Sequence, residues 1–135
     1  MKALIIHGPN MNLLGHFSSN RLTLDKLNRS IRKVAHTKNI ECKIFQTHDE
    51  AKVATLLQRN RNKIDFMILN LGAWHPCSYV IKDTLSLIKK PYRIAEDSNK
   101  SKEYINNTIF DKKYIIKNKN IEESYAESLN QLTQS

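Results

Sequence analysis

Two histidines and a glutamate stand within a few residues of the ends of short apolar runs, where their side chains could take part in proton transfer. They are His48, His75 and Glu96. A histidine can give or take a proton near neutral pH, and a carboxyl group can do so when burial raises its pKa. We interpret His48 and His75 as residues that line a pocket rather than as catalytic groups.

The elements that must position these side chains are predicted from the apolar pattern. Five runs are short, rich in isoleucine and aromatic residues and bounded by turn residues, as β-strands are. They cover residues 2–7, 40–46, 64–70, 91–95 and 113–117. Amphipathic helical patterns lie between the runs, and their expected first turns contain capping or acidic residues. These starts are Thr23, Asp49 with Glu50, Ser78, and a last helix from about Ile121.

Strands and helices that alternate along one chain predict an α/β fold with a parallel sheet covered on both faces. The loops that follow the strands then meet at the carboxyl edge of the sheet, where such folds bind ligands. These loops are residues 8–22, 47–49, 71–77 and 96–100. Because no internal repeat, low-complexity tract or linker interrupts the pattern, we expect a single domain over residues 1–135.

The formal net charge is +9, but the lysines and arginines are spread along the chain. Aromatic residues do not alternate with them as a platform for single-stranded nucleic acid would require, so nucleic acid is not the expected partner. No run approaches the roughly 20 apolar residues of a membrane span, and we expect a cytoplasmic protein that does not contact membranes. Cys42 and Cys77 lack a Cys-x-x-Cys spacing, which predicts neither a metal site nor a redox motif.

Two segments of the chain resemble segments of the type II dehydroquinases, the 3-dehydroquinate dehydratases. Residues 5–15, IIHGPNMNLLG, are similar to the family's opening, a strand followed by Gly-Pro-Asn-Leu-Asn-Leu-Leu-Gly. Residues 69–78, LNLGAWHPCS, with Ile81-Lys82-Asp83 after them, resemble the family's Asn-Pro-Gly-Ala-Tyr-Thr-His-Thr-Ser and its trailing Ile-Arg-Asp. Weaker similarities occur at residues 46–50 and 98–99.

The resemblance implies a flavodoxin-like three-layer sandwich whose five-stranded parallel sheet has the order 2-1-3-4-5. It also implies self-association into trimers or dodecamers. The implied reaction is loss of water from 3-dehydroquinate through an enolate, without a cofactor or a metal. Such a reaction needs a base, stabilisation of the enolate oxygen and an acid for the departing hydroxyl group.

The resemblance assigns catalytic positions to Asn10 and Glu96. In the family, the equivalent of Asn10 holds a water against the enolate, and Glu96 stands where the family has its acid histidine. The base is missing, because the family's loop carries an arginine and a tyrosine whereas residues 16–22, HFSSNRL, are shorter and contain no tyrosine. His16 or Arg21 could compensate. Glu96 could instead be an ionised carboxylate in a surface pair with a lysine.

The resemblance also assigns substrate-binding positions. Asn70 and Ser98 match residues that hold ligand hydroxyl and carboxylate groups, and Asp83 matches a carboxylate that reaches a neighbouring subunit's site. His75 and His48 each lie one place away from a histidine of the family's pocket.

The chemical positions depart from the family pattern more than the fold positions do. Ile105, for example, stands where the family has an arginine that would pair with a substrate carboxylate. The loss of the base, of the acid and of the arginine for the substrate carboxylate together predicts little turnover of 3-dehydroquinate. Our first hypothesis is a pseudoenzyme or ligand-binding relative whose ligand is a small polyol acid similar to 3-dehydroquinate. The alternatives are a divergent dehydratase with displaced groups and a different reaction on the same scaffold.

Overall fold

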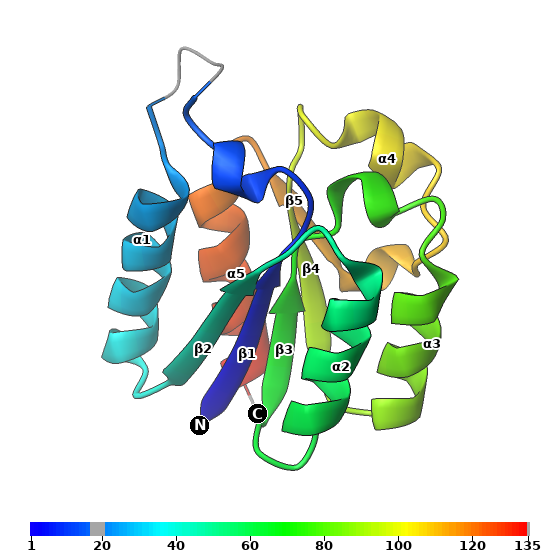
Figure 1. Cartoon of the computed structure of the whole chain (residues 1–135). Helices are drawn as coiled ribbons and strands as arrows, with labels where there is room; N and C mark the ends of the chain where they lie inside the picture. Colours follow the sequence, from blue (N-terminus) through cyan, green and yellow to red (C-terminus); the bar gives the residue numbers. More distant parts are fainter. Residues whose placement is uncertain (17–20, 135) are drawn as a thin grey trace.

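Five parallel strands form the centre of the molecule. The computed structural model describes residues 1–16 and 21–134. The strands are β1 (Lys2–His7), β2 (Glu41–Gln46), β3 (Phe66–Leu69), β4 (Tyr92–Asp97) and β5 (Ile115–Asn118). They pair in parallel in the order β2-β1-β3-β4-β5 (Figure 1). The predicted sheet and its strand order are therefore confirmed.

Helices cover both faces of this sheet. They are α1 (Leu24–Thr37), α2 (Glu50–Asn60), α3 (Tyr79–Ile88), α4 (Lys102–Asn106) and α5 (Ile121–Thr133). Helices α1 and α5 lie on one face and α2 and α3 on the other, whereas α4 lies beyond the carboxyl edge (Figure 1). None of the described helices is long and apolar enough to cross a membrane.

The alternation of side chains along β1 explains the two hydrophobic cores. Because neighbouring residues of a strand point to opposite faces, Ala3 and Ile5 pack against α1 and α5, while Leu4 and Ile6 pack against α2 and α3. All four side chains are buried, as expected for a central parallel strand.

The helices begin at the capping residues Thr23 and Ser78 and at the acidic residue Asp49, as predicted from the sequence. Thr23 Oγ1 accepts a hydrogen bond from the Lys26 amide at 3.3 Å, and Asp49 Oδ1 accepts one from Ala51 at 2.9 Å. Ser78 Oγ accepts one from Ile81 at 3.4 Å. Each bond satisfies a backbone donor that the first turn of a helix leaves unpaired.

The predicted strand ends differ from the observed ones by two residues at most, and one helix was not predicted. The last strand begins at Ile115 rather than at residue 113, because Asp111 Oδ1 accepts from the Lys113 amide and starts a 3-10 turn over Lys112–Tyr114. Helix α4 was not predicted. It has five residues, too few to show a helical period in the sequence.

Gly8 allows the chain to leave β1 against the end of β3. A Cβ atom at Gly8 would lie 2.4 Å from the backbone oxygen of Asn70, a distance that real contacts do not reach. After Pro9, the backbone of Asn10 is left-handed, with φ 67°, a conformation that asparagine adopts more readily than most residues. Residues 8–10 therefore turn the chain across the carboxyl edge of the sheet.

Candidate ligand-binding site

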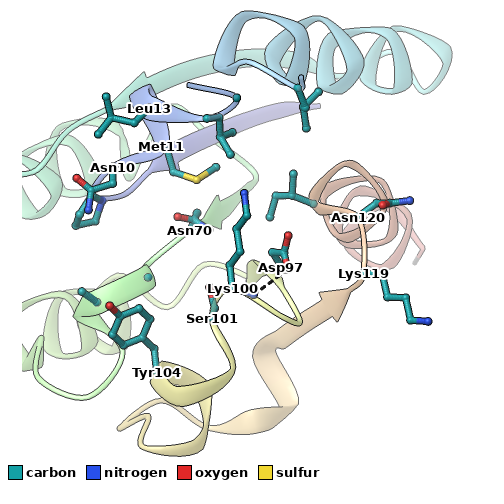
Figure 2. A pocket seen from close by; sticks show the side chains of 17 residues that line it. Asn10, Met11, Leu13, Asn70, Asp97, Lys100, Ser101, Tyr104, Lys119 and Asn120 are labelled. Carbon is teal, nitrogen blue, oxygen red and sulfur yellow. Dashed lines mark hydrogen bonds between the residues drawn. The ribbon is translucent and has the colours of Figure 1, made fainter. Parts of the chain in front are cut away.

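A cavity of about 330 Å³ opens at the carboxyl edge of the sheet. Segments that follow β1, β3, β4 and β5 contribute its walls, as Figure 2 shows. Its polar lining includes Asn10, Asn70, Asp97, Lys100, Ser101 and Tyr104. The sheet reverses its winding between β1 and β3, where open α/β sheets bind their ligands. This cavity is therefore the candidate functional site.

The Glu96 carboxylate lies beneath the cavity wall and organises it. The side chain is fully buried. Its Oε1 accepts from Asn70 Nδ2 (2.8 Å) and Ser101 Oγ (3.0 Å), and its Oε2 accepts from the amides of Leu71 (3.0 Å) and Gly72 (3.3 Å) and from His75 Nε2 (2.6 Å). A buried charge is tolerated only when it is paired and hydrogen-bonded in this way. The carboxylate ties the ends of β3 and β4 to the start of α4.

His75 completes this buried cluster. Glu96 Oε2 also accepts from the amides of Leu71 and Gly72, and this arrangement favours a proton on His75 Nε2 in the Glu96–His75 contact. On the other side of the ring, Nδ1 contacts Thr108 Oγ1 at 2.8 Å, and this hydroxyl oxygen accepts from the Phe110 amide. His75 therefore connects the cavity wall to the segment before β5.

These contacts fix the orientation of the Asn70 amide. Its Nδ2 donates to the Ala95 carbonyl at 3.0 Å as well as to Glu96, and neither partner can donate in return. Asn70 Oδ1 consequently faces away from them, and Asn70 lines the cavity. The Ser101 hydroxyl also donates its hydrogen bond to Glu96. Both side chains can thus offer acceptor oxygens to a ligand.

A second buried group of polar side chains lies next to the end of β1. His7 Nε2 is 2.8 Å from Asn28 Oδ1, and His7 Nδ1 is 2.7 Å from the Tyr125 hydroxyl. Burial lowers the pKa of His7 from 6.5 to about 4, against a smaller opposite effect of the Asn28 hydrogen bond. Burial, together with the negative charge of Glu96, raises the pKa of Tyr125 well above its usual value. His7 is therefore neutral at pH 7 and joins β1 to α1 and α5.

The structure brings some of the predicted site residues together and separates others. Asn10 and Asn70 line the cavity. Glu96 and His75 contact each other but are fully buried, and neither lines the cavity. The expectation that Glu96 could form a surface pair with a lysine is wrong, because the carboxylate is buried and pairs with His75.

The remaining predicted residues lie outside the cavity lining. Ser98 donates its amide to the Asn118 carbonyl at 2.9 Å and so links the ends of β4 and β5. His48 is exposed, and its Nδ1 accepts from the Asn10 amide at 3.3 Å. Asp83 is exposed on α3. Part of the loop with His16 and Arg21 (residues 17–20) lies outside the described residues.

Several residues of the lining were missed by the sequence prediction. They are Asp97, Lys100, Ser101, Tyr104, Lys119 and Asn120. Asp97 and Lys100 lie in the predicted loop 96–100, so their position after a strand pointed to the site. The sequence around them does not otherwise distinguish them from ordinary surface residues. Within the described part of the chain, no group of three or more His, Cys, Asp or Glu side chains could hold a metal ion.

The fold and the cavity together define a flavodoxin-like α/β protein with a candidate small-molecule site at the switch point of its sheet. The family model described as dehydroquinase class II matches residues 1–102. The chain belongs to this family.

Relatives with curated names agree with this assignment. The 3-dehydroquinate dehydratase of Francisella philomiragia is 34% identical over 96 residues, which are 68% of this chain and 64% of the relative. That of Thermotoga neapolitana is 35% identical over 94 residues, 67% of this chain and 63% of the relative. The match thus spans less than two thirds of the length of these relatives.

Solved structures share the fold over nearly the whole chain. The type II dehydroquinase from Butyrivibrio crossotus has a TM-score of 0.87 at 23% identity and covers 99% of this chain and 98% of its own. A 3-dehydroquinate dehydratase-like protein from Bifidobacterium longum has a TM-score of 0.68 at 17% identity and covers 99% of both chains. At these identities the likeness concerns the fold.

Proposed function

We propose that this chain binds a small hydroxylated carboxylic acid similar to 3-dehydroquinate and does not dehydrate it efficiently. The observation that carries the proposal is the position of Glu96. The resemblance assigns this residue to the place of the family's acid, whereas its carboxylate is fully buried beneath the cavity and accepts hydrogen bonds on both oxygens. A general acid must reach the leaving group and hold a proton to give.

The cavity supports the binding part of the proposal. Its volume of about 330 Å³ lies at the small end of the range for ligand pockets. Asn70 Oδ1 and Ser101 Oγ can accept from ligand hydroxyl groups, because the Asn70 Nδ2 group and the Ser101 hydroxyl proton are directed at Glu96. A ring that carries several hydroxyl groups is the chemistry that such acceptors match.

A divergent dehydratase is the second candidate, and the names of the relatives favour it. The relatives from Francisella philomiragia and Thermotoga neapolitana are both 3-dehydroquinate dehydratases. In this alternative, a group from the loop before α1 or from α4 would act as the base.

One experiment separates the two candidates. We expect purified chain to bind 3-dehydroquinate saturably in isothermal titration calorimetry, while the absorbance of the conjugated enone product stays at the level of the buffer. Formation of the enone in proportion to protein concentration would establish the dehydratase instead. Absence of binding heat at millimolar ligand would contradict both candidates.

Asn10 allows a direct test of the cavity with a matched control elsewhere in the chain. Asn10→Gly removes a side chain that lines the cavity and keeps the left-handed backbone accessible. We expect it to weaken binding about threefold to tenfold, the effect of one lost hydrogen bond. Asn39→Gly is the control, because Asn39 is also left-handed but is exposed and outside the cavity lining.

We also propose that the chain works as a single domain that self-associates, as trimers or dodecamers. Helix α3 supports this proposal, since it exposes Tyr79, Val80 and Leu87 to 65%, 51% and 73%, and Asp83 lies between Tyr79 and Leu87 at helical spacing. We expect light scattering to give a mass well above that of one chain, and a monomer at every concentration would contradict the proposal. A cytoplasmic location stays a prediction.

A further inference from the structure

Lys100 is a cation of the cavity lining whose ammonium group has no partner among the described residues. It follows β4, and its side chain extends into the space between Asn70 and the opposite wall in Figure 2. Among the residues that the structure describes, no carboxylate lies within ion-pair distance of Lys100 Nζ, and Nζ makes no hydrogen bond. Lys119 also lines the cavity, but its side chain points away from it (Figure 2).

The backbone beneath Lys100 is held in place by its neighbours. Asp97 Oδ1 accepts from the amides of Asn99 at 2.8 Å and Lys100 at 3.0 Å. The Asp97 carbonyl accepts from the Ser101 amide at 3.1 Å, and Ser101 Oγ donates to the buried Glu96 carboxylate. Lys100 is thus attached to the buried cluster through a tight turn, which fixes the point at which its side chain leaves the backbone.

The charges of the lining are separated rather than neutralised. Asp97 and Lys100 border the same cavity without an ion pair between their side chains, and within the described residues Asp97 Oδ2 accepts no hydrogen bond. A ligand with an anionic group and neutral hydroxyl groups satisfies both side chains, because the anion can meet Lys100 while a hydroxyl group donates to Asp97.

We propose that Lys100 binds the carboxylate of the ligand and thereby determines the specificity of the cavity for acids. This inference rests on the proposed function and adds the residue that selects the ligand. A lysine provides a compact charge on a flexible stem, and its hydrogen bond to a carboxylate is stronger than one between neutral groups. Asp97 then orients the same ligand by accepting from one of its hydroxyl groups.

The test compares one anionic and one neutral probe of nearly the same shape. Quinate is a cyclohexane polyol with a carboxylate, and methyl quinate replaces that charge with an ester. Calorimetry on the full chain is expected to give tighter binding of quinate than of methyl quinate. Lys100→Met should weaken quinate about tenfold or more, the range for a hydrogen bond to a charged group, and leave methyl quinate unchanged.

Control variants separate this role from general electrostatics and from folding. Lys102→Met removes the same charge from an exposed residue of α4 outside the cavity lining, and we expect it to keep both affinities. Lys100→Arg should recover part of the quinate affinity. Unchanged melting temperatures establish that the variants are folded. Equal quinate binding by wild type and Lys100→Met overturns the role of Lys100 alone, whereas a wild type that binds neither probe overturns the proposed function as well.

Discussion

Glu96→Gln is expected to lower the free energy of unfolding by about 3 kcal/mol, because it leaves buried donors without an acceptor. If the new amide nitrogen replaces Oε2, it faces the amides of Leu71 and Gly72 and the ring N–H of His75. If it replaces Oε1, it faces Asn70 Nδ2, while the hydroxyl of Ser101 can turn to accept. The second orientation costs less, but both remove the charge that strengthens every bond of the cluster.

Urea denaturation at pH 7 measures this effect. Glu103→Gln is the matched control, because Glu103 is exposed on α4 and its carboxylate has no hydrogen-bond partner in the described residues. We expect the control to stay within about 0.5 kcal/mol of wild type, as surface substitutions usually do. A loss of less than about 1 kcal/mol for Glu96→Gln would contradict the structural role of the carboxylate, since a typical lost hydrogen bond alone costs that much.

The second large effect is a loss of stability in mild acid that comes from His7. Burial lowers its pKa from 6.5 to about 4 in the folded chain, so the unfolded chain takes up the proton first as the pH falls. Stability is therefore lost between about pH 6.5 and pH 4. The shift corresponds to roughly 3 kcal/mol over the whole window. Above pH 6.5 the ring is neutral in both states and this contribution no longer changes with pH.

His7→Gln tests this assignment through the slope of stability against pH rather than through stability alone. We expect the variant to be destabilised at pH 7, because it disturbs the contacts with Asn28 and Tyr125, and to lose less stability than wild type between pH 7 and pH 5. His36→Gln changes an exposed histidine of α1 and should keep the wild-type slope. Equal slopes for wild type and His7→Gln would exclude His7 as the source of the acid sensitivity.

The sequence predicted the fold well because the signals that define it are local. Apolar runs give the strands, and Thr23, Asp49 and Ser78 mark helix starts whose hydrogen bonds the structure contains. Helix α4 was missed because five residues carry no period. In the sequence, residues 3–6 form one apolar run. The structure shows that Ala3 and Ile5 belong to one hydrophobic core and that Leu4 and Ile6 belong to the other.

The candidate site was predicted less completely, because its geometry depends on contacts between distant residues. Asn10 and Asn70 line the cavity as expected, since both follow central strands. The state of Glu96 could not be derived from its neighbours along the chain, because His75 and Asn70, which bury and bind it, lie 21 and 26 residues away. Lys100 carried no sequence signal beyond its place after a strand.

The close approach of Gly8 to the Asn70 backbone gives the glycine of the Gly-Pro-Asn motif a structural role. A side chain at residue 8 would collide with the Asn70 backbone, just after β3, whether or not any reaction takes place in the cavity. The requirement for a folded protein is therefore enough by itself to explain a glycine at residue 8. A motif of this kind records ancestry and packing, and a search for active enzymes in this family should weigh the loop before α1 more heavily than the turn after β1.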